Sequence, residues 1–170
     1  MKKSHLNISL CGFMGAGKST MGKYLSDKFN KKFIDLDTYI ENKYQLKISD
    51  LFAKGEDYFR DLESICLNKI FNTETNFVLA LGGGTVCFNN NLQLVKHYST
   101  LIYIRCDINT LTERLWHERH NRPLIKNIST KKDLSTYITQ KLSEREAFYQ
   151  QADITSNSIE EVFSAIQIGN

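Results

Sequence analysis

The sequence predicts an α/β fold in which a parallel sheet is covered by helices on both faces. Short apolar runs recur along the chain, and segments with the periodicity of amphipathic helices separate them. Two of these runs lead directly into glycine-rich segments, as strands do at the ligand-binding edge of such a sheet. The expected strands are residues 6–11, 33–36, 77–81, 101–104 and 153–155.

Helices are expected in the intervals between these strands. In residues 18–29, Met21, Leu25 and Phe29 recur one helical turn apart and so share one face. Ser158 and Glu161 have the spacing of a capping box, which predicts that the last helix begins there. The other expected helices are residues 57–71, 107–118 and 132–149.

Size and composition indicate one domain over residues 1–170. Charged residues make up 24% of the chain and hydrophobic residues 41%, which is ordinary for a globular protein. The formal net charge of +3 suits an anionic small molecule but is too small to indicate nucleic acid. We expect a monomer that binds a small-molecule substrate and has neither a nucleic-acid nor a membrane partner.

The apolar segments and the cysteines favour a cytoplasmic protein. No run approaches the ~20 apolar residues of a membrane span, and polar residues interrupt the apolar start of the chain. The cysteines form no C-x-x-C pair and have no zinc-site spacing, so we expect reduced, mostly buried thiols. They are Cys11, Cys66, Cys87 and Cys106.

Residues 12–19 have the pattern G-x-x-x-x-G-K-[ST] of a phosphate-binding loop, between an expected strand and an expected helix. Glycines let successive backbone N–H groups point toward one anion, and the helix N-terminus adds further donors. Lys18 would then reach the β- and γ-phosphates, and the Ser19 hydroxyl would bind Mg²⁺. A chance match in a glycine-rich turn is the alternative. The motif predicts a nucleotide but does not identify a phosphoryl acceptor.

Asp35 and Asp37 close the second expected strand. The alternation of side chains along a strand predicts that both carboxylates share one face, where one supports a metal and the other engages an acceptor hydroxyl. A turn or a helix cap is the alternative for either residue. Nearby cations are expected to keep Asp37 ionised.

Three further features lie at strand ends or far apart in the chain. The glycine triplet 82–84 follows the third expected strand and would let a ligand approach the backbone, although a flexible turn is the alternative. Arg60 and Arg145 would clamp a carboxylate, although surface ion pairs explain either one locally. The basic segment 116–132 is either a mobile lid or an exposed loop.

Together these motifs resemble the shikimate kinase family over nearly the whole chain. The resemblance rests on the ordered set of motifs, because the phosphate loop alone is common to many kinases. Its elements are residues 12–20, Asp35-Leu36-Asp37, residues 48–63, Gly82-Gly83-Gly84, Arg122-Pro123-Leu124, and Glu144-Arg145 with Tyr149.

The resemblance implies a three-layer P-loop NTPase fold of the nucleoside-monophosphate-kinase type, with a central five-stranded parallel sheet and a mobile lid. It implies ATP-dependent phosphorylation of the shikimate 3-hydroxyl, in the pathway to chorismate and aromatic amino acids. The phosphate loop is then 12–19, the acceptor-binding region 37–63 and the lid 116–132.

The resemblance also implies roles for individual residues. Lys18, Asp37 and Arg122 are the catalytic residues, a Gly83 N–H helps position the hydroxyl, and Asp35 supports Mg²⁺ through water beside the ligand Ser19. Residues 155–158 flank the adenine. The implied ATP-binding residues are Gly15, Ala16, Gly17, Lys18, Ser19, Thr20, Arg114 and Arg122. The implied shikimate-binding residues are Asp37, Arg60, Gly82, Gly83, Gly84 and Arg145.

Two departures from the family pattern matter, in residues 145–149 and in the lid between Arg114 and Arg122, and two other functions compete. Where the family commonly has R-x-P-L-Y, residues 145–149 keep the arginine-to-tyrosine spacing but have Ala147 in place of the proline. Lid length varies in the family, which makes Arg114 the least secure of the ATP contacts. The competing functions are another small-metabolite kinase of the same fold, such as a gluconate kinase, and a nucleotide-binding regulatory module without catalysis.

Overall fold

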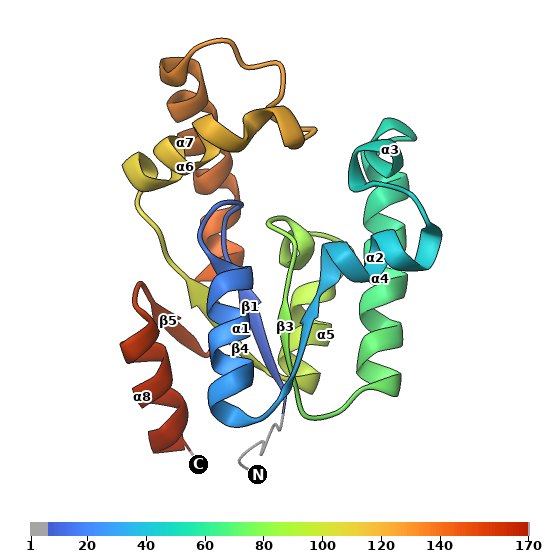
Figure 1. The fold of residues 1–170 in the computed structure, drawn as a ribbon, viewed down its shortest axis with the longest axis vertical. Coiled ribbons are helices and arrows are strands. Elements are labelled where there is room, and N and C mark those ends of the chain that lie inside the picture. Colours follow the sequence, from blue (N-terminus) through green and yellow to red (C-terminus); the bar gives the residue numbers. More distant parts are fainter. Residues whose placement is uncertain (1–6, 170) are drawn as a thin grey trace.

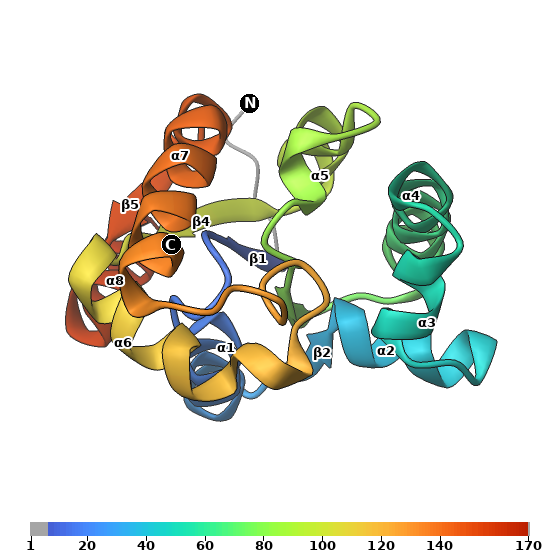
Figure 2. The same ribbon diagram turned by 90° about the horizontal axis from the view of Figure 1, so that it is seen from above.

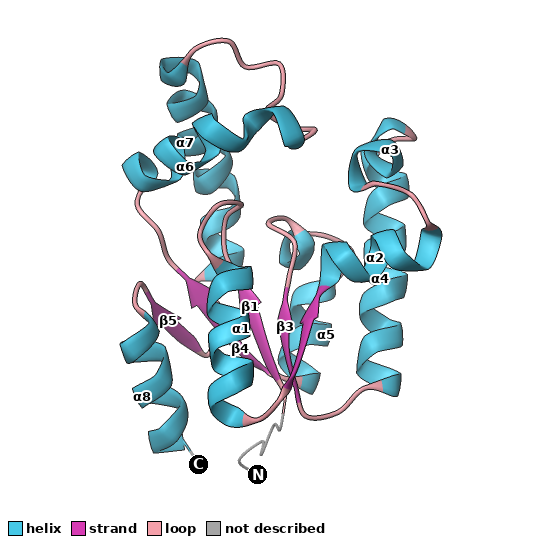
Figure 3. Cartoon of the chain, in the orientation of Figure 1, coloured by secondary structure: helices cyan, strands magenta, loops and turns pink. Residues whose placement is uncertain are grey.

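The computed structural model describes residues 7–169 and contains a five-stranded parallel sheet in the order β2-β3-β1-β4-β5. The strands fan out at the centre of the molecule (Figure 1, Figure 3). Residue 6, which the sequence analysis placed in the first strand, lies outside the described residues. The strands are β1 Ile8–Cys11, β2 Lys32–Asp35, β3 Phe77–Ala80, β4 Thr100–Ile104 and β5 Ile154–Ser156.

The central strands are buried on both faces, which explains why their sequences are continuous apolar runs rather than alternating ones. Every residue of β1 and β3 is buried. Side-chain alternation divides the core in two: Val78 and Ile102 face one cluster, whereas Leu79 and Leu101 face the other. The buried hydroxyl of Ser9 on β1 accepts a hydrogen bond from Ser99 Oγ at 2.7 Å.

Helices cover both faces of the sheet, as expected. One core cluster contains side chains from α1, α6, α7 and α8, and the other contains side chains from α2, α3, α4, α5 and the end of α7. Figure 2 shows the two groups of helices on either side of the strands. The helices are α1 Lys18–Phe29, α2 Leu36–Tyr44, α3 Ile48–Ala53, α4 Glu56–Thr73, α5 Asn91–Tyr98, α6 Ile108–Glu118, α7 Lys131–Tyr149 and α8 Ile159–Gly169.

The expectation about the end of the second strand needs correction. β2 ends at Asp35, and Asp37 lies in the first turn of α2, so the two aspartates do not share a strand face. Asp35 is the N-cap of α2: its Oδ1 accepts a hydrogen bond from the Thr38 N–H at 3.2 Å. A helix therefore begins one residue after the strand, because a capping side chain replaces a longer turn.

The other elements that the sequence predicted agree with the structure to within a residue or two, whereas α2 and α5 form where no helix was expected. Helix α1 has the expected bounds, and α7 begins one residue before the expected start. Ser158 Oγ accepts a hydrogen bond from the Glu161 N–H at 3.2 Å, but the Glu161 carboxylate binds the Ser156 hydroxyl. Only half of the capping box therefore forms.

All four cysteines are free, and Cys11 and Cys66 are buried. Burial raises the pKa of the Cys11 thiol to about 12, which makes it an inert core residue beside the phosphate loop. Within residues 7–169, no helix is both long enough and apolar enough to cross a membrane.

Candidate active site

The phosphate loop joins β1 to α1 and has the backbone geometry of an anion site. Gly12, Gly15 and Gly17 have φ angles of 141°, 79° and 98°, which L side chains rarely adopt. A Cβ on Gly12 would lie 2.6 Å from the Ile104 carbonyl oxygen, so this position also requires close approach of two strand ends. No side chain caps α1, which leaves its N-terminal N–H groups open to a ligand.

Lys18 is buried at the base of this loop. Its Nζ donates hydrogen bonds to the carbonyl oxygens of Gly12 and Phe13, at 2.8 and 2.9 Å. Burial lowers the pKa of Lys18 to about 8, although Asp37 counteracts the shift. The ammonium group thus has neutral partners and a weakened hold on its proton, and a phosphate would supply the missing negative charge.

Ser19 and Asp35 are brought together where α1 meets the end of β2. The Ser19 hydroxyl donates a hydrogen bond to Asp35 Oδ2 at 2.6 Å. Together they present one hydroxyl and one carboxylate beside the phosphate loop. Mg²⁺ in nucleotide sites prefers this sparse donor set, because the nucleotide phosphates and water complete its octahedron. The described residues contain no cluster of three or more His, Cys, Asp or Glu side chains that would hold a metal alone.

The Asp37 carboxylate lies in a partly buried, negatively charged environment. Its pKa is raised to about 6, by burial first and then by Glu63 and Asp35, against the lowering influence of Lys18 and Arg122. Burial and the two neighbouring carboxylates, rather than the cations, therefore set the direction of the pKa shift. The carboxylate is still mostly ionised at pH 7, about a unit above that pKa.

The glycine triplet lies between β3 and a 3₁₀ turn at Thr85–Cys87. None of its residues has a positive φ, so the glycines are needed for close approach rather than for backbone freedom. A Cβ on Gly82 would lie 2.7 Å from Glu63 Oε1, and one on Gly84 would lie 2.6 Å from Arg60 Nη2. Among the described residues, the N–H groups of Gly83 and Gly84 donate to no protein acceptor.

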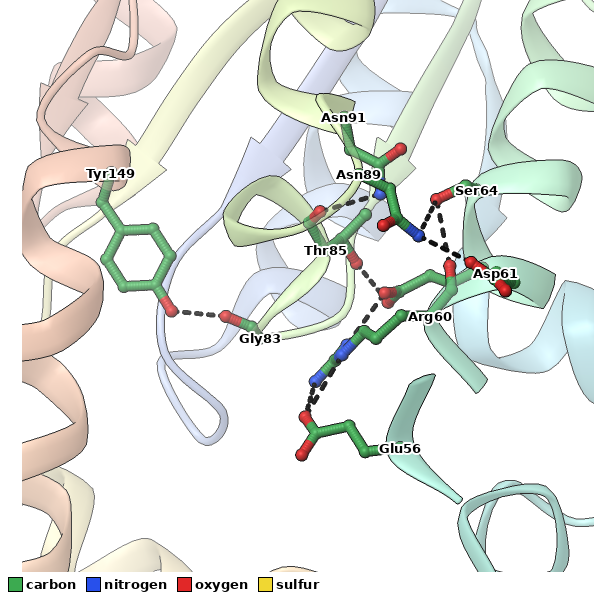
Figure 4. A network of polar contacts seen from close by, with 10 residues as sticks. Glu56, Arg60, Asp61, Ser64, Gly83, Thr85, Asn89, Asn91 and Tyr149 are labelled. Carbon is green, nitrogen blue, oxygen red and sulfur yellow. Dashed lines mark hydrogen bonds and ion pairs between the residues drawn. The ribbon is translucent and has the colours of Figure 1, made fainter. Parts of the chain in front are cut away.

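Arg60 extends from α4 under this triplet and is held by two carboxylates (Figure 4). Its Nη1 donates to Glu63 Oε2 at 2.8 Å, and its Nε and Nη2 donate to Glu56 Oε1 at 3.3 and 3.1 Å. Glu63 is fully buried and also accepts a hydrogen bond from Thr85 Oγ1. The guanidinium group stacks on the Phe88 ring at 4.4 Å. These contacts fix its position before any ligand binds.

Arg145 lies on α7, in a different environment from Arg60. Only 7% of the residue is exposed, and its guanidinium group lies 5.6 Å from the centre of the Phe13 ring. Among residues 7–169, no carboxylate forms an ion pair with it. The missing proline does not disturb this position, because α7 continues regularly through Ala147. A buried cation without an anion indicates an anionic ligand.

The segment expected to be a lid or an exposed loop is partly structured. It contains the end of α6, a 3₁₀ turn at Arg119–Asn121 and the fully buried side chain of Ile125, which anchors it to the core. Arg122 forms an ion pair with Glu118 at 2.6 Å. From α6, Arg114 Nη1 donates to the Gly15 carbonyl oxygen at 3.1 Å. Both arginines line the cleft on the side of α6, which is its upper side in Figure 1.

One cleft, with a volume of about 1250 Å³, brings these parts together. Of the segment 155–158 expected beside adenine, only Asn157 lines it, with the neighbouring Ile159. Sequence reasoning assigned no role to Glu56 or Glu63; their helical spacing to Arg60 was the available signal. The predicted residues that line the cleft are Gly15, Ala16, Gly17, Lys18, Ser19, Thr20, Asp35, Asp37, Arg60, Gly82, Gly83, Gly84, Arg114, Arg122 and Arg145.

A phosphate loop at the end of a parallel strand, facing carboxylates and arginines across one cleft, defines a P-loop kinase. A family model described as shikimate kinase matches residues 14–167. The chain belongs to the shikimate kinase family, whose activity is the ATP-dependent phosphorylation of shikimate.

Relatives of known sequence agree with this assignment. The chain is 43% identical over 148 residues to a shikimate kinase of Azobacteroides pseudotrichonymphae, covering 86% of both chains. It is 38% identical over 157 residues to a shikimate kinase of Staphylococcus aureus, covering 92% of this chain and 88% of the relative.

Solved structures agree as well. A shikimate kinase from Bacteroides thetaiotaomicron superposes with a TM-score of 0.85 at 33% identity, over 95% of this chain and 94% of the other. A shikimate kinase from Acinetobacter baumannii, solved in complex with shikimate, superposes with a TM-score of 0.89 at 26% identity, over 99% and 96%.

Proposed function

We propose that the cleft holds ATP on the phosphate loop and shikimate on the facing arginines, and transfers the γ-phosphoryl group to the shikimate 3-hydroxyl. The buried Arg145, without a carboxylate partner, is the observation that carries this proposal, because it requires an anionic acceptor. Arg60 lines the same cleft. The carboxylate of shikimate has the charge and planar shape that two guanidinium groups recognise.

The nucleotide end consists of the loop amides, Lys18 and the two arginines on the upper side. On binding, Lys18 exchanges the carbonyl oxygens of Gly12 and Phe13 for phosphate oxygens. Arg122 leaves Glu118 and meets the charge that develops during transfer. Arg114 and residues 155–158 lie toward the nucleoside, with Asn157 lining the cleft.

Mg²⁺ fits this end of the cleft. Ser19 would bind it directly and Asp35 through water, since the hydroxyl and carboxylate are already paired at 2.6 Å. The ion supplies charge neutralisation on the phosphates when bound.

At the acceptor end, Asp37 and the open N–H of Gly83 position the 3-hydroxyl toward the γ-phosphate. The new bond joins this oxygen to phosphorus while the bond to the β-phosphate oxygen of ATP breaks, leaving ADP. The hydroxyl proton passes to the Asp37 carboxylate, whose raised pKa suits it for accepting a proton late in a loose transfer. Positioning and charge stabilisation supply most of the catalysis.

Some finer features belong to the same proposal. We infer a single domain over residues 1–170 with an acceptor-binding region at 37–63 and a mobile lid at 116–132. We also infer a monomer in the cytoplasm, where the four free cysteines fit a reducing environment. Light scattering of the purified protein tests the monomer; a dimer mass contradicts it.

An acceptor profile tests the proposed reaction. ADP release is followed with ATP and Mg²⁺ plus shikimate, gluconate or no acceptor. We expect release only with shikimate. Release with gluconate alone indicates the other small-metabolite kinase, and ATP binding without acceptor-dependent release in a folded sample indicates a regulatory module.

A further inference from the structure

Tyr149, in the last turn of α7, links this helix to the glycine triplet. Its side chain is fully buried, and its hydroxyl donates a hydrogen bond to the Gly83 carbonyl oxygen (Figure 4). The two residues are 66 positions apart in the chain. Burial raises the pKa of Tyr149, so the hydroxyl keeps its proton and remains a donor throughout the physiological range.

Packing fixes the position of this hydroxyl. The Tyr149 ring stacks on the Tyr103 ring of β4, with ring centres 5.0 Å apart. The Tyr103 hydroxyl in turn donates to Glu146 Oε2 on α7 at 3.1 Å. The tyrosine is therefore held by the sheet as well as by its own helix, and it presents its hydroxyl to the triplet from a rigid base.

The hydrogen bond sets the direction of a peptide plane. A trans peptide has its C=O and N–H on opposite sides, so holding the Gly83 carbonyl toward α7 directs the Gly84 N–H away from α7. Arg60 lies against Gly84, where a Cβ would come within 2.6 Å of its Nη2. The 3₁₀ turn holds the flanking Gly82 and Gly84 carbonyl oxygens, but within the described residues the Gly83–Gly84 peptide itself forms its one hydrogen bond with Tyr149.

The same helix carries Arg145 one turn before Tyr149. Residues four apart share a helix face, so α7 presents Arg145 and Tyr149 toward the same region. Helix α7 therefore sets the positions of two parts of the proposed acceptor site that lie far apart in the sequence. It carries the guanidinium group of Arg145, and through Tyr149 it holds the amides of the triplet.

We propose that Tyr149 is a positioning residue for phosphoryl transfer: its hydroxyl fixes the Gly83–Gly84 peptide, and with it the triplet amides, relative to Arg145 and the acceptor. The proposal rests on the proposed function, because it assumes that the acceptor occupies this part of the cleft. It assigns a role to a hydroxyl group that touches neither substrate.

Tyr149→Phe tests this, with Tyr103→Phe as a matched control. Each variant removes one hydroxyl from the same stacked pair, but only the first removes the bond to Gly83. Loss of one such bond is expected to lower kcat/KM for shikimate about five- to tenfold in Tyr149→Phe, with the KM for ATP changed less than about twofold. Tyr103→Phe should stay near wild type for both substrates.

Equal losses in the two variants, an equal rise in the KM for ATP, or unchanged kcat/KM for shikimate in Tyr149→Phe would overturn the proposal. A second measurement does not depend on catalysis. In ¹⁵N-glycine-labelled free protein, Tyr149→Phe should shift and broaden the amide signals of Gly83 and Gly84, whereas Tyr103→Phe should not. Unchanged signals refute the positioning role. Inactivity of the wild type with shikimate refutes the proposed function instead.

Discussion

Replacing Arg145 with methionine should affect stability and substrate binding differently. The buried charge does not stabilise the free protein, but it binds the acceptor. Methionine keeps the length of the side chain and removes its charge. In the free protein Arg145 is buried, has no carboxylate ion-pair partner among residues 7–169, and contacts the Phe13 ring and the Tyr149 side chain; a cation–π contact of this kind contributes about 0.5–1 kcal/mol. Relief from burying an unpaired charge offsets that loss. The melting temperature should therefore stay within about 2 °C of wild type or rise.

The same substitution should strongly weaken the binding of the acceptor, shikimate. Removing one partner of a buried charged pair costs about 2–5 kcal/mol. Arg60 remains to hold the carboxylate, so we expect the lower part of this range, a loss of about 100-fold in kcat/KM for shikimate. The affinity for ATP should not change, because the proposed function assigns Arg145 to the acceptor and not to the nucleotide.

Steady-state kinetics with each substrate varied in turn, together with thermal unfolding, measure both effects. Lys132→Met is the control, since Lys132 lies on the same helix but is exposed. It should change neither quantity. A destabilised Arg145→Met with an unchanged KM for shikimate would mean that the guanidinium group has a structural partner and that the reasoning is wrong.

Three further predictions concern other parts of the cleft. The kcat/KM for shikimate should fall as the pH drops through about 6, where Asp37 gains a proton. Glu63→Gln removes a negative neighbour and should move this midpoint to lower pH, whereas the control Asp61→Asn, at an exposed position, should not. A midpoint unmoved by Glu63→Gln counts against the assignment of this pKa to Asp37. Ser19→Ala should raise the Mg²⁺ concentration for half-maximal rate about tenfold or more, measured at fixed ATP, and an unchanged requirement rules out Ser19 as a ligand. Hydrogen exchange in residues 116–132 should slow when nucleotide and shikimate bind together, and equal exchange with and without them would argue against lid closure.

The phosphate loop could be predicted fully from the sequence because its chemistry is local. Eight consecutive residues determine the turn, the open amides and the placement of Lys18 and Ser19. The positions of the strands and the two-sided covering of the sheet also follow from local patterns, because buried parallel strands are short and continuously apolar, whereas the strand order required the structure.

The acceptor side depends on long-range packing, which spacing does not encode. The reasoning that placed Asp35 and Asp37 on one strand face was wrong, although both line the cleft, because the capping by Asp35 starts a helix at Leu36. Helix α5 was not predicted, since its polar start hides a short apolar face. The bond from Tyr149 to Gly83 and the convergence of Arg60 and Arg145 on one cleft required the structure.

The raised pKa of Asp37 also depends on tertiary structure. Sequence reasoning counted the cations that a phosphate loop brings, but the fold adds burial and places Glu63 close by. Glu63 is itself fixed by Arg60 and Thr85, from an adjacent helical turn and from the segment after the triplet. Such a network is recognisable only after the elements are packed.

The chemical identity of the product tests the central claim most directly. The protein is incubated with ATP, Mg²⁺ and shikimate, and the mixture is examined by ³¹P and ¹H NMR. The account predicts equal amounts of ADP and one phosphomonoester, with phosphorus coupled to the proton on carbon 3 of the ring. ADP and inorganic phosphate with unchanged shikimate, or phosphorylation at another hydroxyl, would contradict it.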